Sequence, residues 1–111
     1  MQVVFVVLHK TELLQDLLTK LKKAGVSGGT IIDSQGMISY IQESDESYIL
    51  GSLRLFLEQA RPDSKTMFFI IKDEQVDLVF ETIDKALGGL ENHNTGIAFA
   101  MPITRVDGVV K

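Results

Sequence analysis

The chain has 111 residues, a net charge of -4 and no cysteine. A chain of this length can bury one core without staples, so we expect a single domain over residues 1–111. The lack of cysteine excludes disulfides and thiolate metal sites, and it favours a reducing, cytoplasmic location. The negative charge gives no general reason to expect a nucleic-acid partner.

The chain begins with an apolar run over Val3–Leu8 that does not alternate with polar residues, which is typical of a strand buried on both faces. A leucine stripe then predicts an amphipathic helix that Thr11 caps and Gly25 ends. A second strand is expected over roughly Val26–Ser34, before Gly36. The stripe consists of Leu13, Leu14, Leu17, Leu18 and Leu21.

Gly28 and Gly29 leave a stretch of backbone without side chains at the start of this second strand. Glycine allows a ligand or a partner to come close to the main chain. Ordinary turn formation also explains such glycines, and from the spacing alone it is the favoured interpretation.

The segment from residue 37 to residue 64 is too long for a simple connection, so it is expected to be functional or disordered. Its first half is acidic, and its second half has apolar residues at helical spacing before Pro62, which predicts a short helix. This helix either packs on the domain or binds a partner protein. The candidate partner-binding residues are Leu50, Leu53, Phe56 and Leu57.

A second apolar run without alternation covers Thr66–Ile71, and Asp73 is expected to cap the helix that follows. The last strand, G-I-A-F-A-M-P-I, has large side chains on one face and Ala98 and Ala100 on the other. Its small face is expected to make close contacts. The large residues are Ile97, Phe99 and Met101.

The predicted order is β-α-β, a long loop, then β-α-β, which is the α+β ferredoxin-like arrangement of one antiparallel sheet with two helices on a single face. The first and third strands would be central. Because the chain has enough helix for only one face, the other face would expose apolar side chains. Another copy of the chain is the expected cover, which makes the protein an oligomer.

Three segments resemble the PII signal-transduction family, whose members are trimeric ferredoxin-like regulators. A-G-V-S-G-G-T-I-I-D-S-Q-G is similar to the family's G-[IV]-T-G-M-T-V-x-x-V-x-G. K-T-M-F-F-I-I-K-D-E-Q-V-D-L-V is similar to K-V-K-I-E-I-V-V-P-D-D-x-V-D-x-V, and T-G-I-A-F-A-M-P-I resembles D-G-K-I-F-V-x-P-V. The resemblance implies a homotrimer that binds an adenine nucleotide (AMP, ADP or ATP) or a small anion between subunits. It also implies control of a transporter or an enzyme through the long loop.

By this resemblance Gly28, Thr30, Gly36 and Gly96 line the nucleotide cleft. Ile97 replaces the family's phosphate-binding lysine, Phe68 replaces a glutamate, and the C-terminal arginine pair is missing. Lys65 and Arg105 remain as candidate phosphate ligands. Since contacts to charged groups dominate phosphate binding, we expect adenosine to be recognised better than the triphosphate.

No set of nucleophile, base and orienting residue is apparent, so the sequence does not predict an enzyme. The two histidines, His9 and His93, are far apart in sequence, and no metal site is predicted. Two functions from different classes remain. One is a regulator that senses a ligand, and the other is a trimeric scaffold whose cleft is vestigial.

Overall fold

The computed structural model describes residues 1–37, 40–41, 63–91 and 95–109. Short 3₁₀ turns, Thr11–Leu13 and Asp73–Gln75, lead directly into the two helices. The predicted order of strands and helices around the long loop is confirmed. The elements are β1 (Gln2–Leu8), α1 (Leu14–Lys23), β2 (Thr30–Ser34), β3 (Ser64–Ile71), α4 (Val76–Ala86) and β4 (Gly96–Pro102).

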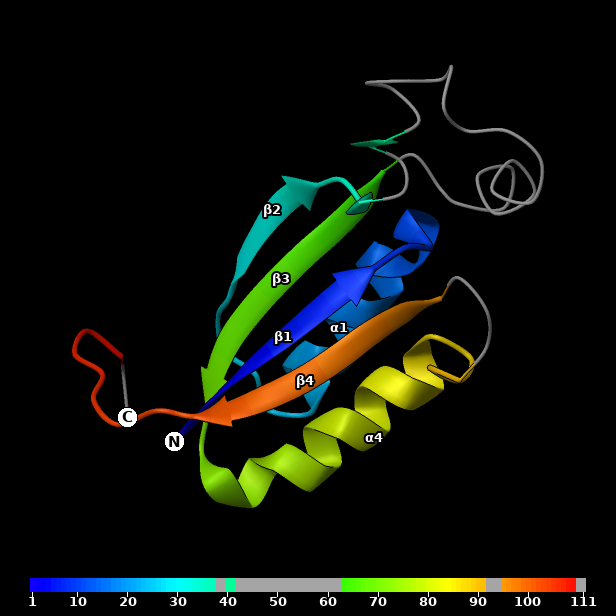
Figure 1. Cartoon of the computed structure of the whole chain (residues 1–111). Coiled ribbons are helices and arrows are strands. Elements are labelled where there is room, and N and C mark those ends of the chain that lie inside the picture. Colours follow the sequence, from blue (N-terminus) through cyan, green and yellow to red (C-terminus); the bar gives the residue numbers. More distant parts are fainter. Residues whose placement is uncertain (38–39, 42–62, 92–94, 110–111) are drawn as a thin grey trace.

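The strands form one antiparallel sheet in the order β2-β3-β1-β4 (Figure 1). The strands with unbroken apolar runs, β1 and β3, are therefore central, as predicted. A four-stranded antiparallel sheet with two helices is an α+β arrangement that is compatible with the ferredoxin-like fold.

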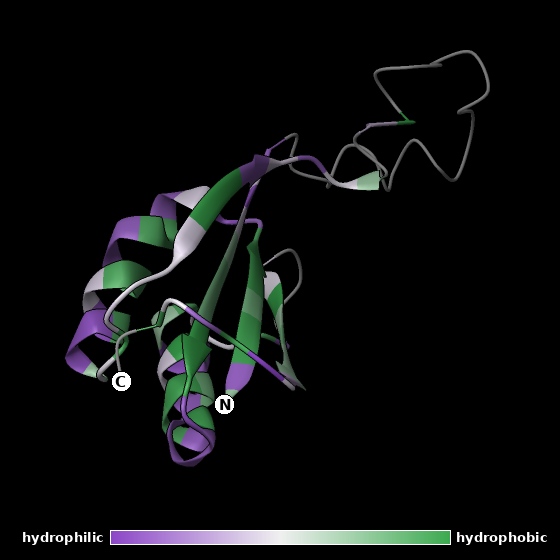
Figure 2. Cartoon of the chain, turned by 90° about the vertical axis from the view of Figure 1, so that its left-hand side faces the viewer, coloured by the Kyte–Doolittle hydropathy of each residue, from purple (hydrophilic) through white to green (hydrophobic). Residues whose placement is uncertain are grey.

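The core lies between the sheet and the two helices, which pack against each other on the same face. Alternate residues of β1, namely Val4, Val6 and Leu8, are fully buried there. Figure 2 shows the central strands as largely hydrophobic, whereas the helices mix hydrophobic and hydrophilic positions. The helices add Leu17, Leu21, Val79 and Ile83, and β3 adds Met67, Phe69 and Ile71.

Glycine ends α1 as expected, because Gly25 has a φ of 101°, which other residues adopt at a cost. The last strand also packs as expected. Ala98 and Ala100 lie against the core, while Phe99 on the opposite face is 41% exposed. Small side chains on the inner face let β4 pack against the core.

Three sequence expectations were wrong in detail. The second strand does not begin at Val26, because regular pairing with β3 starts only at Thr30. Thr11 does not cap α1, since it is the first residue of a 3₁₀ turn without a side-chain cap. Asp73 binds the N-terminal ammonium at 3.2 Å instead, and the Gln75 Oε1 accepts a hydrogen bond from the Lys72 N–H at 3.0 Å.

The expected loop helix and its partner-binding residues lie outside the described residues, which omit residues 42–62. At the start of this segment the Gly36 carbonyl accepts a hydrogen bond from the Tyr40 N–H at 2.9 Å. Over the part of the chain that the structure describes, none of the helices has the length and apolar character needed to cross a membrane.

The assignment of the core can be tested by replacing one buried and one exposed leucine of the helices with alanine. Leu17→Ala removes a fully buried side chain and should lower the free energy of unfolding by about 2–5 kcal/mol. Leu78→Ala is the control, because Leu78 is 52% exposed, and its effect should stay within roughly 0.5 kcal/mol. Urea titrations followed by circular dichroism measure both. Equal losses of unfolding free energy in the two variants would show that α1 does not pack as described.

Candidate ligand cleft and open sheet face

Among the described residues, no helix covers one of the two faces of the sheet, and we call this face the open face. Its side chains come from all four strands, because the register brings alternate residues to the same side. None of the strand residues on this face is charged. They are Val3, Phe5, Val7, Thr30, Ile32, Ser34, Ser64, Thr66, Phe68, Ile70, Ile97, Phe99 and Met101.

Three phenylalanines form a row across the middle of the open face. Phe5 is directly opposite Phe68 of β3 and Phe99 of β4. The ring centroids of Phe5 and Phe99 are 5.2 Å apart with an interplanar angle of 11°, and those of Phe5 and Phe68 are 5.6 Å apart. These separations are within the range of favourable aromatic pairs, so the row is a fixed feature of the sheet.

The open face is exposed at its edges. Ile32 on one edge strand is 48% exposed, and Ile97 on the other is 54% exposed. Contiguous apolar surface of this kind usually marks a contact with another molecule. The face therefore has the character of an interface.

A cleft of about 430 Å³ lies where the open face meets the edge strand β2. We call it the edge cleft. It is bounded by the start of β2, by β3 and by the C-terminal tail. Its lining residues are Ser27, Gly28, Gly29, Thr30, Phe68, Phe69, Ile70, Gly108 and Val109.

Two of the glycines that line the edge cleft differ in how much space a side chain would have at each position. A Cβ on Gly29 would lie 3.1 Å from the Phe68 carbonyl oxygen and 3.2 Å from the Phe69 Cβ, so even alanine would require β3 to shift by a few tenths of an ångström. A Cβ on Gly28 would meet nothing within 4 Å, and its φ is not in the left-handed range. The fold does not require glycine at position 28, so the bare backbone there calls for another explanation.

The chemistry of the edge cleft is neutral. The backbone N–H groups of Ser27 and Gly28 donate no hydrogen bond to other described residues, and Ser27 and Thr30 add hydroxyls. Phe68 supplies an aromatic side chain. No lining residue is charged, so this cleft can hold a flat group with polar edges but offers no charge-assisted contact to phosphate.

The structure brings only two of the predicted cleft residues together, Gly28 and Thr30. Lys65 and Gly96 lie at the opposite end of the sheet, where both pair in register with Leu8, and Gly36 follows β2 at that end. Within one chain, these residues do not form a single site.

Lys65 and Gly96 have explanations within the fold. The Lys65 Nζ forms an ion pair with the Asp33 carboxylate of the neighbouring strand. A Cβ on Gly96 would lie 2.6 Å from the Val7 carbonyl oxygen, a distance that real Cβ atoms do not show. Glycine at position 96 is therefore required for β4 to approach β1.

Arg105 is exposed in the tail after β4, where its guanidinium donates to the Asp107 carboxylate at 3.1 Å. It does not line the edge cleft, although Gly108 and Val109 of the same tail do. The Arg105 guanidinium could contact a ligand in the edge cleft only after its ion pair with Asp107 breaks.

Sequence reasoning missed a cluster of hydroxyls at the end of β2. Ser34 Oγ is 2.7 Å from Ser64 Oγ and 2.8 Å from Thr66 Oγ1. The cluster depends on the register of β2 with β3, which no sequence pattern indicated. The contribution of the tail to the edge cleft was also missed, because no sequence pattern indicates where Gly108 and Val109 lie relative to the sheet.

Comparisons with known proteins leave the family open: no family model matches the chain, and no curated protein matches it significantly. Among the described residues no group of three potential metal ligands is close enough to hold an ion. His93 lies outside the described residues.

Glycine requirements can be tested at positions 96 and 28. Gly96→Ala should destabilise the protein by about 1–3 kcal/mol, because the new Cβ would force β4 away from the Val7 carbonyl. Gly28→Ala should change the free energy of unfolding by less than about 1 kcal/mol, since its Cβ has open space. Thermal and urea unfolding measure both. A large loss for Gly28→Ala would remove the argument that the bare backbone there serves a ligand.

Proposed function

We propose that the protein is a PII-like regulator that assembles through its open face and binds a small ligand in clefts between copies. A response to this ligand would be passed to a partner protein, a transporter or an enzyme, through residues 37–64. The observation that carries the proposal is the position of the edge cleft, which adjoins the open face at Phe68 and Ile70. A copy packed on that face would border the cleft.

Self-association is supported by the chemistry of the open face. Aromatic residues on an open four-stranded sheet also occur in proteins that stack RNA bases, but those proteins add cations for the backbone. The strand residues of the open face include no lysine or arginine, and the chain has a net charge of -4. A second apolar surface suits this face better than a polyanion, and an identical chain supplies one.

An adenine nucleotide is the ligand that we propose for the edge cleft. The N–H groups of Ser27 and Gly28, which donate to no described residue, the Thr30 hydroxyl and the Phe68 ring suit the polar edge and the flat face of a base. The uncharged lining supports binding of the adenosine part more than of the phosphates. Threefold assembly is proposed from the PII resemblance.

The same uncharged lining favours a second function, a trimeric scaffold in which the cleft binds no ligand. In this alternative the open face serves assembly alone. The two functions share the oligomer and differ in ligand binding, so separate experiments are needed for each.

Assembly can be tested with a charge on the open face. Phe5→Glu should leave a folded monomer, because a carboxylate in the centre of the phenylalanine row cannot be buried without a partner. Light scattering coupled to size exclusion measures the mass, and circular dichroism measures the fold. The unsubstituted protein should elute as a trimer.

Leu78→Glu is the matched control, since it adds the same charge at an exposed leucine on the outer side of α4 and should keep the trimer. Phe69→Glu should unfold the chain, because Phe69 is only 2% exposed in the core. A monomeric unsubstituted protein at micromolar concentration would refute the assembly.

Ligand binding can be tested by thermal shift with adenosine, AMP, ADP and ATP. A ligand that binds only the native state raises the melting temperature. We expect a stabilisation that depends on the adenosine part and gains little from the second and third phosphates. Gly28→Leu should abolish it by filling the edge cleft, whereas Gly36→Leu, which changes a glycine at the far end of β2, should retain it.

Submicromolar ATP binding with a strong dependence on the γ-phosphate would contradict the proposed cleft chemistry. Absence of any shift, with the trimer intact, would leave the scaffold as the function.

A further inference from the structure

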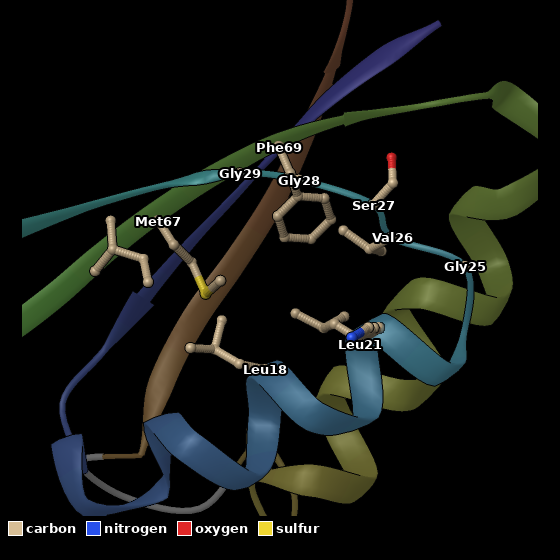
Figure 3. Close-up of a pocket in the computed structure, with 11 residues that line it drawn as sticks. Leu18, Leu21, Gly25, Val26, Ser27, Gly28, Gly29, Met67 and Phe69 are labelled. Carbon is tan, nitrogen blue, oxygen red and sulfur yellow. The ribbon is translucent and has the colours of Figure 1, made fainter. Parts of the chain in front are cut away.

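A second pocket, of about 620 Å³, lies on the helix side of the sheet between α1 and the edge strand β2. We call it the helix-side pocket. Figure 3 shows Leu18 and Leu21 of α1 facing Met67 and Phe69 of β3, while the segment through Gly28 and Gly29 passes over the Phe69 ring. Its apolar lining consists of Leu18, Leu21, Val26, Ile31, Met67 and Phe69.

The pocket exists because the two helices do not cover the outermost strand. Ile31 points to the helix side, as its partner Met67 does, yet it is 44% exposed whereas Met67 is 3% exposed. A helix packed under β2 would bury Ile31. Space of this size with an apolar lining matches pockets that bind small molecules.

One cation and two backbone donors line the pocket. Lys22 lines the pocket, and among the described residues no carboxylate pairs with it, whereas Lys20 on the same helix is paired with Asp16 at 2.9 Å. The N–H groups of Ser27 and Gly28 donate to no other described residue. No acidic residue lines the pocket.

We propose that the helix-side pocket binds a small amphipathic carboxylate, such as a medium-chain acyl or an aromatic acid. The apolar body lies on Met67 and Phe69, and the carboxylate binds the Lys22 ammonium at the rim. Charge complementarity decides for an acid over a neutral apolar ligand, because Lys22 is the charged group of the lining. The pocket is open to solvent along Ile31, so an acyl chain can enter from the edge of the sheet.

This site is separate from the edge cleft. The two share residues 27–29 and Phe69, but the helix-side pocket uses Leu18, Lys22 and Met67, which the edge cleft lacks. Binding there requires neither the trimer nor a nucleotide, so the two proposals fail independently.

Octanoate and the uncharged 1-octanol are the probes for the test, with the full chain labelled for amide NMR. Octanoate should shift the resonances of Lys22, residues 25–29 and Ile31, and should leave those of Val3 and Phe99 on the open face unchanged. Octanoate should also bind more tightly than 1-octanol at low ionic strength.

Lys22→Gln should weaken octanoate binding roughly 2- to 5-fold, as expected for an exposed ion pair, and should not change the binding of 1-octanol. Lys23→Gln is the matched control, because the neighbouring lysine does not line the pocket, and should bind octanoate as the unsubstituted protein does. Ile31→Trp should block both probes by filling the open side.

Equal effects of the two lysine substitutions, or equal affinity for octanoate and 1-octanol, would overturn the assignment of an acid. Shifts confined to the open face, or no binding at millimolar octanoate, would overturn the pocket itself. The adenosine thermal shift, measured on Lys22→Gln, reports separately on the edge cleft and should not change.

Discussion

Two helices cover one face of a four-stranded sheet, and the remaining features of the protein depend on this shortage of cover. On the helix side the core closes under β1 and β3 but leaves Ile31 half exposed. On the other side, no helix of the described part of the chain covers the sheet, and the phenylalanine row lies on the surface. Burial of apolar area is the main stabilising term in folding, so both uncovered regions are places where another molecule can gain binding energy.

Periodicity was sufficient to predict the strands and helices that the structure describes, although not all of their bounds. Runs such as Val3–Leu8 have no polar residue, which predicts burial on both faces. The ferredoxin-like order of the elements predicted that the first and third strands are central, and β1 and β3 are. The leucine stripe likewise identified the inner face of α1. The capping of the helices was less predictable. The Asp73 carboxylate forms an ion pair with the N-terminal ammonium instead of capping the helix, and a local sequence pattern cannot indicate such a distant partner.

The candidate site was predicted only in part, for a reason of geometry. Gly28 and Thr30 are neighbours in sequence and stay together in the structure, whereas Lys65 and Gly96 are brought by the register to the other end of the sheet. The PII resemblance assigned these residues to one nucleotide site. Distances between residues of different strands depend on the pairing register, which the sequence does not reveal. Gly96 also illustrates that a glycine within a motif can be fixed by packing alone, here by the Val7 carbonyl.

Edge strand β2 pairs with β3 over five residues and has none of its own residues in the buried core. Segments with few buried contacts and solvent-facing hydrogen bonds open at a free energy well below that of global unfolding. The other edge strand, β4, pairs with β1 over seven residues and packs Ala98 and Ala100 against the core, so β2 is the strand that we expect to detach first. Since it separates the edge cleft from the helix-side pocket and leads directly to Gly36, transient release of this one strand would alter both cavities and the start of the long loop in a single event.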